Sequence, residues 1–234
     1  MKEANRIVPD LVAHESAPEG VVRMVEKRTL EADGHVYEWF QIEVGLGPED
    51  VVLCRNTKPL VECAYMMIRS GLGCRVEGRD IGEGLVQLAQ HWKDVRSLGV
   101  LIDRVAEYQE REVEKFKSKK QDGKAQAIED KCQTVSLIAG KLLEDGKKDV
   151  QDLVAFIKGL FGDTPEGEKP KVLTLSTIHK SKGREWNRVY ILDRRALIPS
   201  KYAKQEWQLE QERNLEYVAV TRAKRELVDV VSVG

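Results

Sequence analysis

The feature that most constrains the fold is a short apolar run followed by a helical pattern and a second apolar run. Residues 51–54, Val-Val-Leu-Cys, are all apolar, as in a strand that is buried on both faces. Residues 56–59, Asn-Thr-Lys-Pro, end this run, and Thr57 can cap a helix whose apolar residues recur at helical spacing over 60–68. Residues 74–76 form a second strand candidate. Strand, helix and strand in this order predict a βαβ crossover and a parallel sheet.

Further apolar runs extend the predicted sheet. They occupy residues 21–25, 171–176, 189–192 and 227–233. Residues 205–220 show a helical pattern, whereas residues 37–44 fit a strand or a helix, and periodicity does not decide between them. The predicted fold class is therefore α/β, a parallel sheet with flanking helices.

A long helical pattern interrupts these strands. Apolar residues recur with helical period from residue 81 to about 161, and residues 162–170 form a linker of glycine, proline and acidic residues. We therefore expect an all-helical insertion at 81–164 within a sheet domain made of 1–80 and 165–234. The charged stretch 110–124 is interpreted as a solvated helix end and loop, and a patch that contacts DNA is the alternative.

The overall charge excludes several classes of protein. There are 38 basic and 39 acidic side chains, so the net charge is −1, and any contact with nucleic acid must be local. Apolar runs are far shorter than the roughly 20 residues of a membrane span, and the N-terminus shows no secretory pattern, so we expect a cytoplasmic protein. The four cysteines show no C-x-x-C pair and no histidine at ligand spacing, which predicts neither disulfides nor a metal site.

The first cluster of candidate functional residues follows the strand predicted at 171–176. Its polar members are Ser176, Thr177, His179, Lys180, Lys182 and Glu185. Ligands bind at the carboxyl ends of strands in open α/β sheets, which is where this cluster lies. Lys182 beside Gly183 suits a phosphate, although plain solvation of the lysine fits equally well. His179 alone would more often be a surface histidine than a catalyst.

The second cluster lies in the helix predicted at 205–220 and just after it. Three apolar residues form a stripe on this helix, so the remaining charged residues are expected nearer the polar surface. The stripe is Leu215, Val218 and Ala219, and the charged residues are Glu212, Arg213 and Glu216. Arg222 stands between this helix and the last strand, where a guanidinium can reach a phosphate on a neighbouring domain. Its alternative role is to complement the helix dipole.

Several catalytic motifs do not occur in the sequence. There is no G-x-x-x-x-G-K-[ST] loop, no G-x-S-x-G, no H-E-x-x-H and no G-x-G-x-x-G. The chain is therefore not expected to hydrolyse nucleotides by itself, and a metabolic enzyme is disfavoured.

Taken in order, the motifs resemble the C-terminal motor domain of the UvrD/Rep/PcrA-like DNA helicases of superfamily one. Residues 51–56 resemble the family's fourth motif, and 75–85 resemble the segment before its helical insertion. Residues 177–186, Thr-Ile-His-Lys-Ser-Lys-Gly-Arg-Glu-Trp, resemble the fifth motif, and 212–223 resemble the sixth. The resemblance implies a RecA-like fold for the parallel sheet.

The resemblance also implies roles for individual residues. ATP in such motors lies between two RecA-like domains, and the first of them carries the Walker loop and the Mg2+ ligands. By this resemblance Arg222 is the arginine finger, Arg55 a second contact to the γ-phosphate, and Glu185 a residue near the ribose. Thr177, His179 and Lys182 face single-stranded DNA or couple it to the nucleotide.

The expected function is thus the C-terminal motor half of an ATP-dependent DNA helicase or translocase. It is expected to be inactive without the first motor domain. Its expected partners are that first motor domain and single-stranded DNA. The alternative is a non-catalytic RecA-like adaptor that binds DNA or a protein, and a third reading is an insertion whose basic residues 115–124 bind duplex DNA. Two features depart from the family. The insertion is shorter than usual, and Arg184 stands where leucine is more common.

Overall fold

A computed structural model describes residues 2–7, 19–26, 28–32, 35–39, 47–69, 72–162 and 171–232 of the 234-residue chain. Its centre is a six-stranded sheet in which every pair of neighbouring strands is parallel. In spatial order the strands are β1 (Val21–Glu26), β8 (Ala223–Val231), β7 (Trp186–Leu192), β4 (Asp50–Cys54), β6 (Leu173–Thr177) and β5 (Cys74–Val76). The α/β fold with a parallel sheet is confirmed.

Strand β4 lies inside the sheet, and the sequence explains why. All five of its residues are buried, and successive side chains point to opposite faces. Val52 and Cys54 join the apolar cluster that contains α2 (Thr57–Arg69), whereas Val51 and Leu53 join the cluster that contains α8 (Glu206–Val220). Helices thus cover both faces, which is what the apolar run 51–54 within β4 requires.

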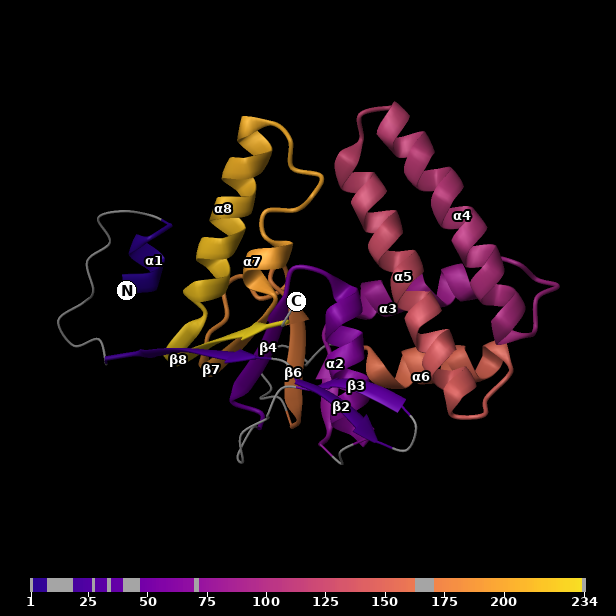
Figure 1. The fold of residues 1–234 in the computed structure, drawn as a ribbon, viewed down its shortest axis with the longest axis horizontal. Helices are drawn as coiled ribbons and strands as arrows, with labels where there is room; N and C mark the ends of the chain where they lie inside the picture. The colour runs from indigo at the N-terminus through magenta and orange to yellow at the C-terminus, as the bar shows by residue number, and fades with distance from the viewer. Residues whose placement is uncertain are drawn as a thin grey trace.

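The helical insertion consists of α3 (Arg79–Ala89), α4 (Leu98–Ser118), α5 (Asp122–Glu144) and α6 (Val150–Leu160). Figure 1 shows α4 and α5 as a pair that rises beside α8. The apolar cluster of these helices is continuous with that of the sheet, since it includes Val76, Leu175 and Tyr190 as well as Leu101 and Ile138. The division of the chain into two separate domains therefore stays a prediction.

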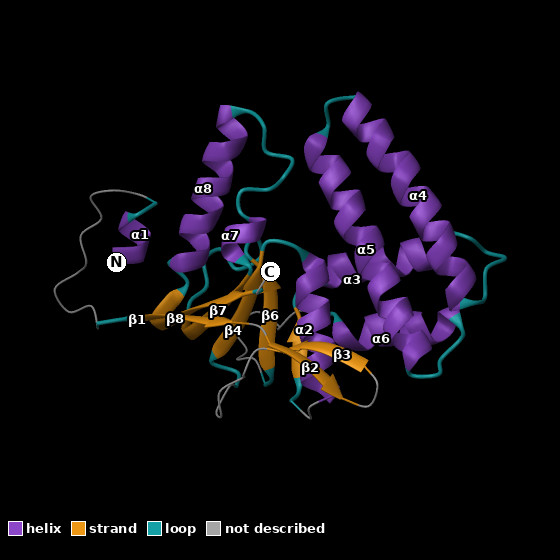
Figure 2. Cartoon of the chain, viewed as in Figure 1, coloured by secondary structure: helices purple, strands orange, loops and turns teal. Residues whose placement is uncertain are grey.

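A hairpin outside the main sheet is the part of the fold that the sequence patterns left open. Strands β2 (Arg28–Ala32) and β3 (His35–Trp39) pair antiparallel, and Figure 2 shows them in front of α2. The first three residues of the ambiguous run 37–44 thus belong to a strand. Residues 40–46 lie outside the described part of the chain.

The start of α2 corrects one prediction. Thr57 is already the first residue of the helix, and a residue of the insertion caps it. The carboxylate of Asp130, on α5, accepts hydrogen bonds from the backbone N–H of Thr57 at 2.9 Å and of Lys58 at 3.2 Å. The amides at a helix N-terminus lack partners within the helix and favour an anion, so this contact ties the insertion to the sheet domain.

Two short helices complete the fold. They are α1 (Lys2–Asn5) and α7 (Arg194–Leu197). The guanidinium of Arg194 is buried and binds the carboxylates of Glu3, Glu216 and Asp229. Helix α1 is thereby attached to the sheet and to α8.

Candidate functional site

The segment 178–185 carries three of the predicted site residues, His179, Lys182 and Glu185, and connects β6 to β7. Because these strands are parallel, it runs from the carboxyl edge of the sheet to the amino edge. Ile178 is buried against the α8 face, and its N–H donates to the carbonyl of Cys54 at 3.0 Å. Ser181 is fully buried, and its hydroxyl donates to the carbonyl of Ile178 at 2.8 Å. Gly183 has a φ of +79°, a conformation that favours glycine. These anchors fix the course of the segment.

Arg55 lies at the carboxyl edge, directly after β4, in an ion pair with Glu212. The Nη2 atom of Arg55 is 2.8 Å from Oε1 of Glu212, and Nε is 3.1 Å from Oε2, so the pair is bidentate. Glu212 is 8% exposed and also accepts from the N–H of Ser200 at 3.1 Å. The expectation that Glu212 lies near the polar surface is therefore wrong, since its carboxylate is buried against an arginine.

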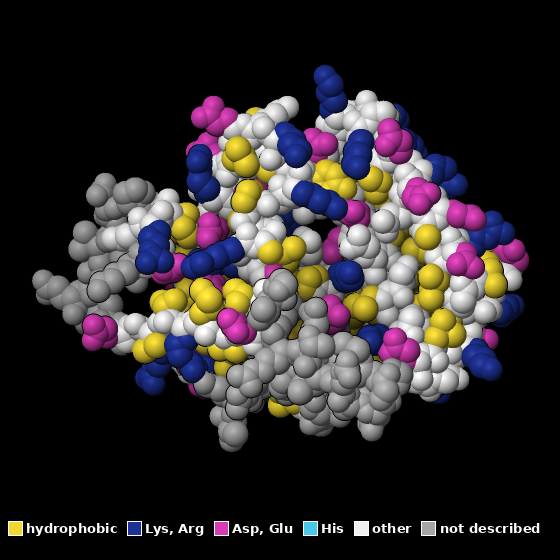
Figure 3. Space-filling model, in the orientation of Figure 1, with side chains coloured by type: hydrophobic (Ala, Val, Ile, Leu, Met, Phe, Trp, Pro, Cys, Tyr) yellow, Lys and Arg dark blue, Asp and Glu magenta, His cyan; other side chains and the backbone are white. Residues whose placement is uncertain are grey.

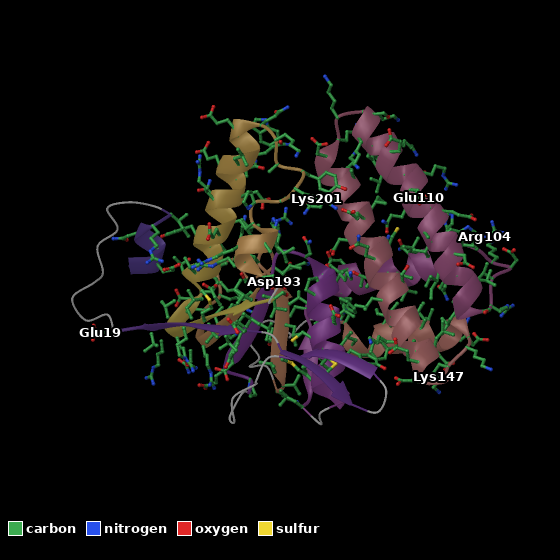
Figure 4. All side chains as sticks on the ribbon, in the orientation of Figure 1. Glu19, Arg104, Glu110, Lys147, Asp193 and Lys201 are labelled. Carbon is green, nitrogen blue, oxygen red and sulfur yellow. The ribbon has the colours of Figure 1, made fainter. Side chains whose placement is uncertain are left out.

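The insertion contributes to this carboxyl edge as well. Gln126 of α5 accepts from Arg55 at 3.3 Å and from the hydroxyl of Ser200 at 2.9 Å. Glu129 of α5 lies 2.7 Å from Nζ of Lys201. Figure 4 shows Lys201 between α8 and α5, and Figure 3 shows a hollow here with basic and acidic side chains at its rim. Polar contacts thus link the insertion to the loop before α8.

His179 belongs to the same cluster. His179 is exposed at the surface, yet desolvation by the surrounding protein lowers its pKa, the positive charges of Arg55 and Lys182 lower it further, and Glu212 opposes the shift. Thr177 is buried, and its hydroxyl accepts from the N–H of Lys180 at 3.4 Å, so it stabilises the turn. Whether Thr177, His179 and Lys182 contact DNA stays a prediction.

Arg222 lies at the other edge of the sheet, directly before β8. Its guanidinium donates three hydrogen bonds: Nε to the carbonyl of Val218 at 2.9 Å, Nη1 to the carbonyl of Arg184 at 2.8 Å, and Nη2 to the hydroxyl of Thr221 at 3.0 Å. Its own carbonyl accepts from the N–H of Trp186 at 2.9 Å. The plane of the guanidinium is therefore fixed by the backbone around it.

Glu185 lies near Arg222, because Trp186 and Ala223 are paired residues of β7 and β8. Its carboxylate is exposed and 3.8 Å from Nζ of Lys224, itself exposed, so the pair holds Glu185 only weakly. The guanidinium of Arg222 and the carboxylate of Glu185 thus lie together at the amino edge of the sheet.

The structure does not bring Arg55 and Arg222 together. One follows the end of a strand and the other precedes the start of a strand in an all-parallel sheet. Their backbones lie at opposite ends of the strands, and β4 alone spans roughly 17 Å over its five residues. The resemblance implies that both arginines contact the γ-phosphate, whereas here they lie at opposite edges of the sheet, and their roles stay a prediction.

Two cavities of the described residues lie away from these two clusters. One cavity of about 620 Å³ lies between α3 and α6, a second of about 380 Å³ lies at the amino ends of β4 and β7, and neither is lined by a predicted site residue. Among the described residues, no group of three or more His, Cys, Asp or Glu side chains could hold a metal ion. Nor, within those residues, is any helix both long and apolar enough to cross a bilayer.

Comparison with known families agrees with the motifs. The family model described as the UvrD-like helicase C-terminal domain matches residues 79–232, so the chain belongs to that family. This is a family of motor domains of ATP-dependent DNA helicases, and the parallel sheet with its flanking helices is its RecA-like fold. The matched range includes Thr177, His179, Lys182, Glu185 and Arg222, whereas Arg55 lies outside it. A search of curated proteins found no match.

Sequence reasoning missed the contacts that three residues make at these sites. They are Glu212, Gln126 and Asp130, which hold Arg55 and the start of α2. Glu212 opens the sixth motif, so its place there was a signal of a role beyond solvation. Gln126 and Asp130 lie in a helix with ordinary amphipathic patterning, and nothing in the sequence marks their partners.

Proposed function

We propose that these residues form the second motor domain of an ATP-dependent DNA helicase or translocase, in which Arg222 is the arginine finger. The proposed partner is a first RecA-like domain that carries the phosphate-binding loop and the ligands of Mg2+. The chain by itself is then inactive in ATP hydrolysis, because its sequence holds no such loop. A cytoplasmic location accords with this function and remains a prediction.

The observation that carries the proposal is the way in which Arg222 is held. A guanidinium has five N–H groups, and three of those of Arg222 donate to its own chain. The other two N–H groups have no acceptor within the described ranges, so they can donate hydrogen bonds to a phosphate oxygen of ATP bound to a facing domain. A donor fixed in advance stabilises the charge on a transferring phosphoryl group without having to reorganise.

Glu185 supports the same assignment, because its exposed carboxylate can accept hydrogen bonds from a ribose beside Arg222. Closing the two domains would bring both groups to ATP, so hydrolysis would depend on closure.

The carboxyl edge is the proposed contact with single-stranded DNA. Arg55, His179 and Lys182 lie close enough to interact electrostatically there, at the opposite edge of the sheet from Arg222. Basic groups that meet a phosphate backbone give local contact without a basic chain overall. We therefore assign Arg55 to the DNA side rather than to the γ-phosphate.

The test is DNA-stimulated ATP hydrolysis by the complete gene product that contains these residues. Replacing Arg222 by alanine is expected to lower kcat about 10³-fold, and Arg222→Lys is expected to restore little of it, because an ammonium cannot make the same planar contacts. The matched control is Arg213→Ala, which removes an exposed arginine from α8, the helix that ends just before Arg222. If Arg222→Ala leaves kcat within twofold of the control, the motor assignment fails, and the hypothesis of a non-catalytic RecA-like adaptor is favoured instead.

A further inference from the structure

Arg184 occupies a central position among the contacts of the segment 178–185. Its guanidinium pairs with the carboxylate of Glu77 and stacks on the ring of Trp186, with 4.8 Å between Cζ and the ring centroid. Its carbonyl accepts the hydrogen bond from Nη1 of Arg222 at 2.8 Å. The side chain and the backbone of one residue thus hold two different partners.

Glu77 provides a firm anchor for this side chain. It lies between β5 and α3, where the chain enters the insertion, and it is 4% exposed. Its N–H donates to the carbonyl of Leu175 at 2.8 Å, which fixes it to the sheet. A buried carboxylate requires a charged or hydrogen-bonding partner, and Arg184 supplies one.

A second contact joins the same two segments but is much weaker. Nζ of Lys180 lies 2.7 Å from Oδ1 of Asp80 in the first turn of α3, and both side chains are well exposed. Pairs of this kind contribute little, because water and salt screen them. It therefore serves as a comparison for the buried anchor.

We propose that Arg184 is a positioning residue, which Glu77 and Trp186 hold so that its carbonyl orients the guanidinium of Arg222. The start of the insertion then sets the geometry of the arginine finger without touching the nucleotide. This inference rests on the function proposed above. It also gives a use to the charge that Arg184 adds where the related helicases more often have leucine.

The first test replaces Arg184 by leucine in the complete gene product and measures steady-state ATP hydrolysis with single-stranded DNA. Misplacing a reacting group by about 1 Å can lower a rate by up to about 100-fold, so we expect kcat to fall about 10- to 100-fold. The KM for ATP and the affinity for DNA should change less than threefold. Arg184→Lys, which keeps the charge beside Glu77, should recover part of kcat, and Asp80→Asn should leave kcat within twofold.

The second test combines Arg184→Leu with Arg222→Ala. If Arg184 acts through Arg222, the double variant is no slower than Arg222→Ala alone. Losses that multiply, or a KM that rises while kcat stays unchanged, would overturn the positioning role. If Arg222→Ala itself has no effect, the proposed function fails instead, so the two failures are distinguishable.

Discussion

The two edges of the sheet treat their arginines differently. At the carboxyl edge, Arg55 is bound to a carboxylate, so its charge is largely balanced by Glu212. At the amino edge, Arg222 donates to two carbonyls and one hydroxyl, which fix its geometry but do not neutralise its positive charge. A fixed and uncompensated cation suits an anionic transition state, whereas a compensated one suits a structural or lower-affinity contact.

The largest expected effect compares the two arginines directly in ATP hydrolysis. At saturating ATP and single-stranded DNA, Arg222→Ala should lower kcat about 10³-fold, whereas Arg55→Ala should lower it less than tenfold. The reason is that only Arg222 lies at the edge that carries Glu185. Steady-state hydrolysis by the complete gene product measures both. Equal losses would return Arg55 to the γ-phosphate and remove the distinction between the edges.

For the free energy of unfolding we expect the opposite order, with a larger loss at the carboxyl edge than at Arg222. Glu212→Ala leaves Arg55 and the N–H of Ser200 without their acceptor in a mostly buried place, so the free energy of unfolding should fall by about 2–4 kcal/mol. Arg222→Ala should change it by less than about 1 kcal/mol, since its guanidinium is only partly buried and water can replace the hydrogen bonds that it donates. Urea unfolding of the chain measures both changes.

A matched control belongs to the Glu212 experiment. In the double variant Arg55→Ala with Glu212→Ala no unpaired charge remains, so its loss should be smaller than the sum of the two single losses. An additive result would mean that the ion pair does not couple the two residues.

The contact of the insertion with α2 should have a smaller effect. Asp130→Ala removes the acceptor of two amides at the helix N-terminus, so we expect a loss of about 1–2 kcal/mol in the free energy of unfolding. Asp130→Asn should lose less, because one amide oxygen remains. Glu110→Ala, on an exposed part of α4, is the control and should stay within about 0.5 kcal/mol. A loss no greater than that of the control would show that the insertion does not cap α2.

The smallest effects concern DNA at the carboxyl edge. Lys182→Ala should weaken binding of single-stranded DNA a few-fold and lower the slope of log affinity against log salt by about 0.7. Lys119→Ala, in the basic stretch of the insertion, should leave both unchanged. The opposite outcome for these two lysines would favour the insertion as the DNA-binding part. Fluorescence anisotropy of a labelled oligonucleotide gives both quantities.

His179 predicts a pH dependence for the same binding. Its pKa lies below the usual 6.5 in the free chain, so the ring is mostly neutral at pH 7. A bound phosphate would raise this pKa, so binding takes up a proton and affinity should increase as pH falls from about 7.5 to 5.5. His179→Gln should flatten this dependence. An unchanged slope in that variant would place DNA away from His179.

The order of strands and motifs could be predicted because both are local properties of the sequence. Apolar runs such as residues 51–54 and 189–192, bounded by polar and turn residues, are typical of buried strands, and periodicity identifies the insertion. The burial of Glu212 could not be predicted, because its partner Arg55 is 157 residues away along the chain. The placement of Arg55 and Arg222 at opposite edges follows from their positions in the sequence, since Arg55 comes directly after a strand and Arg222 directly before one.

The shared apolar cluster has a consequence for how the insertion can move. Side chains of α3 to α6 interlock with those of the sheet, and Asp130 adds a polar contact at the end of α2. A swing of the insertion about its two connections to the sheet would expose that interior to water over several helices. Displacement of the insertion is therefore restricted to sliding of packed surfaces by small side-chain adjustments, a shear motion and not a hinge.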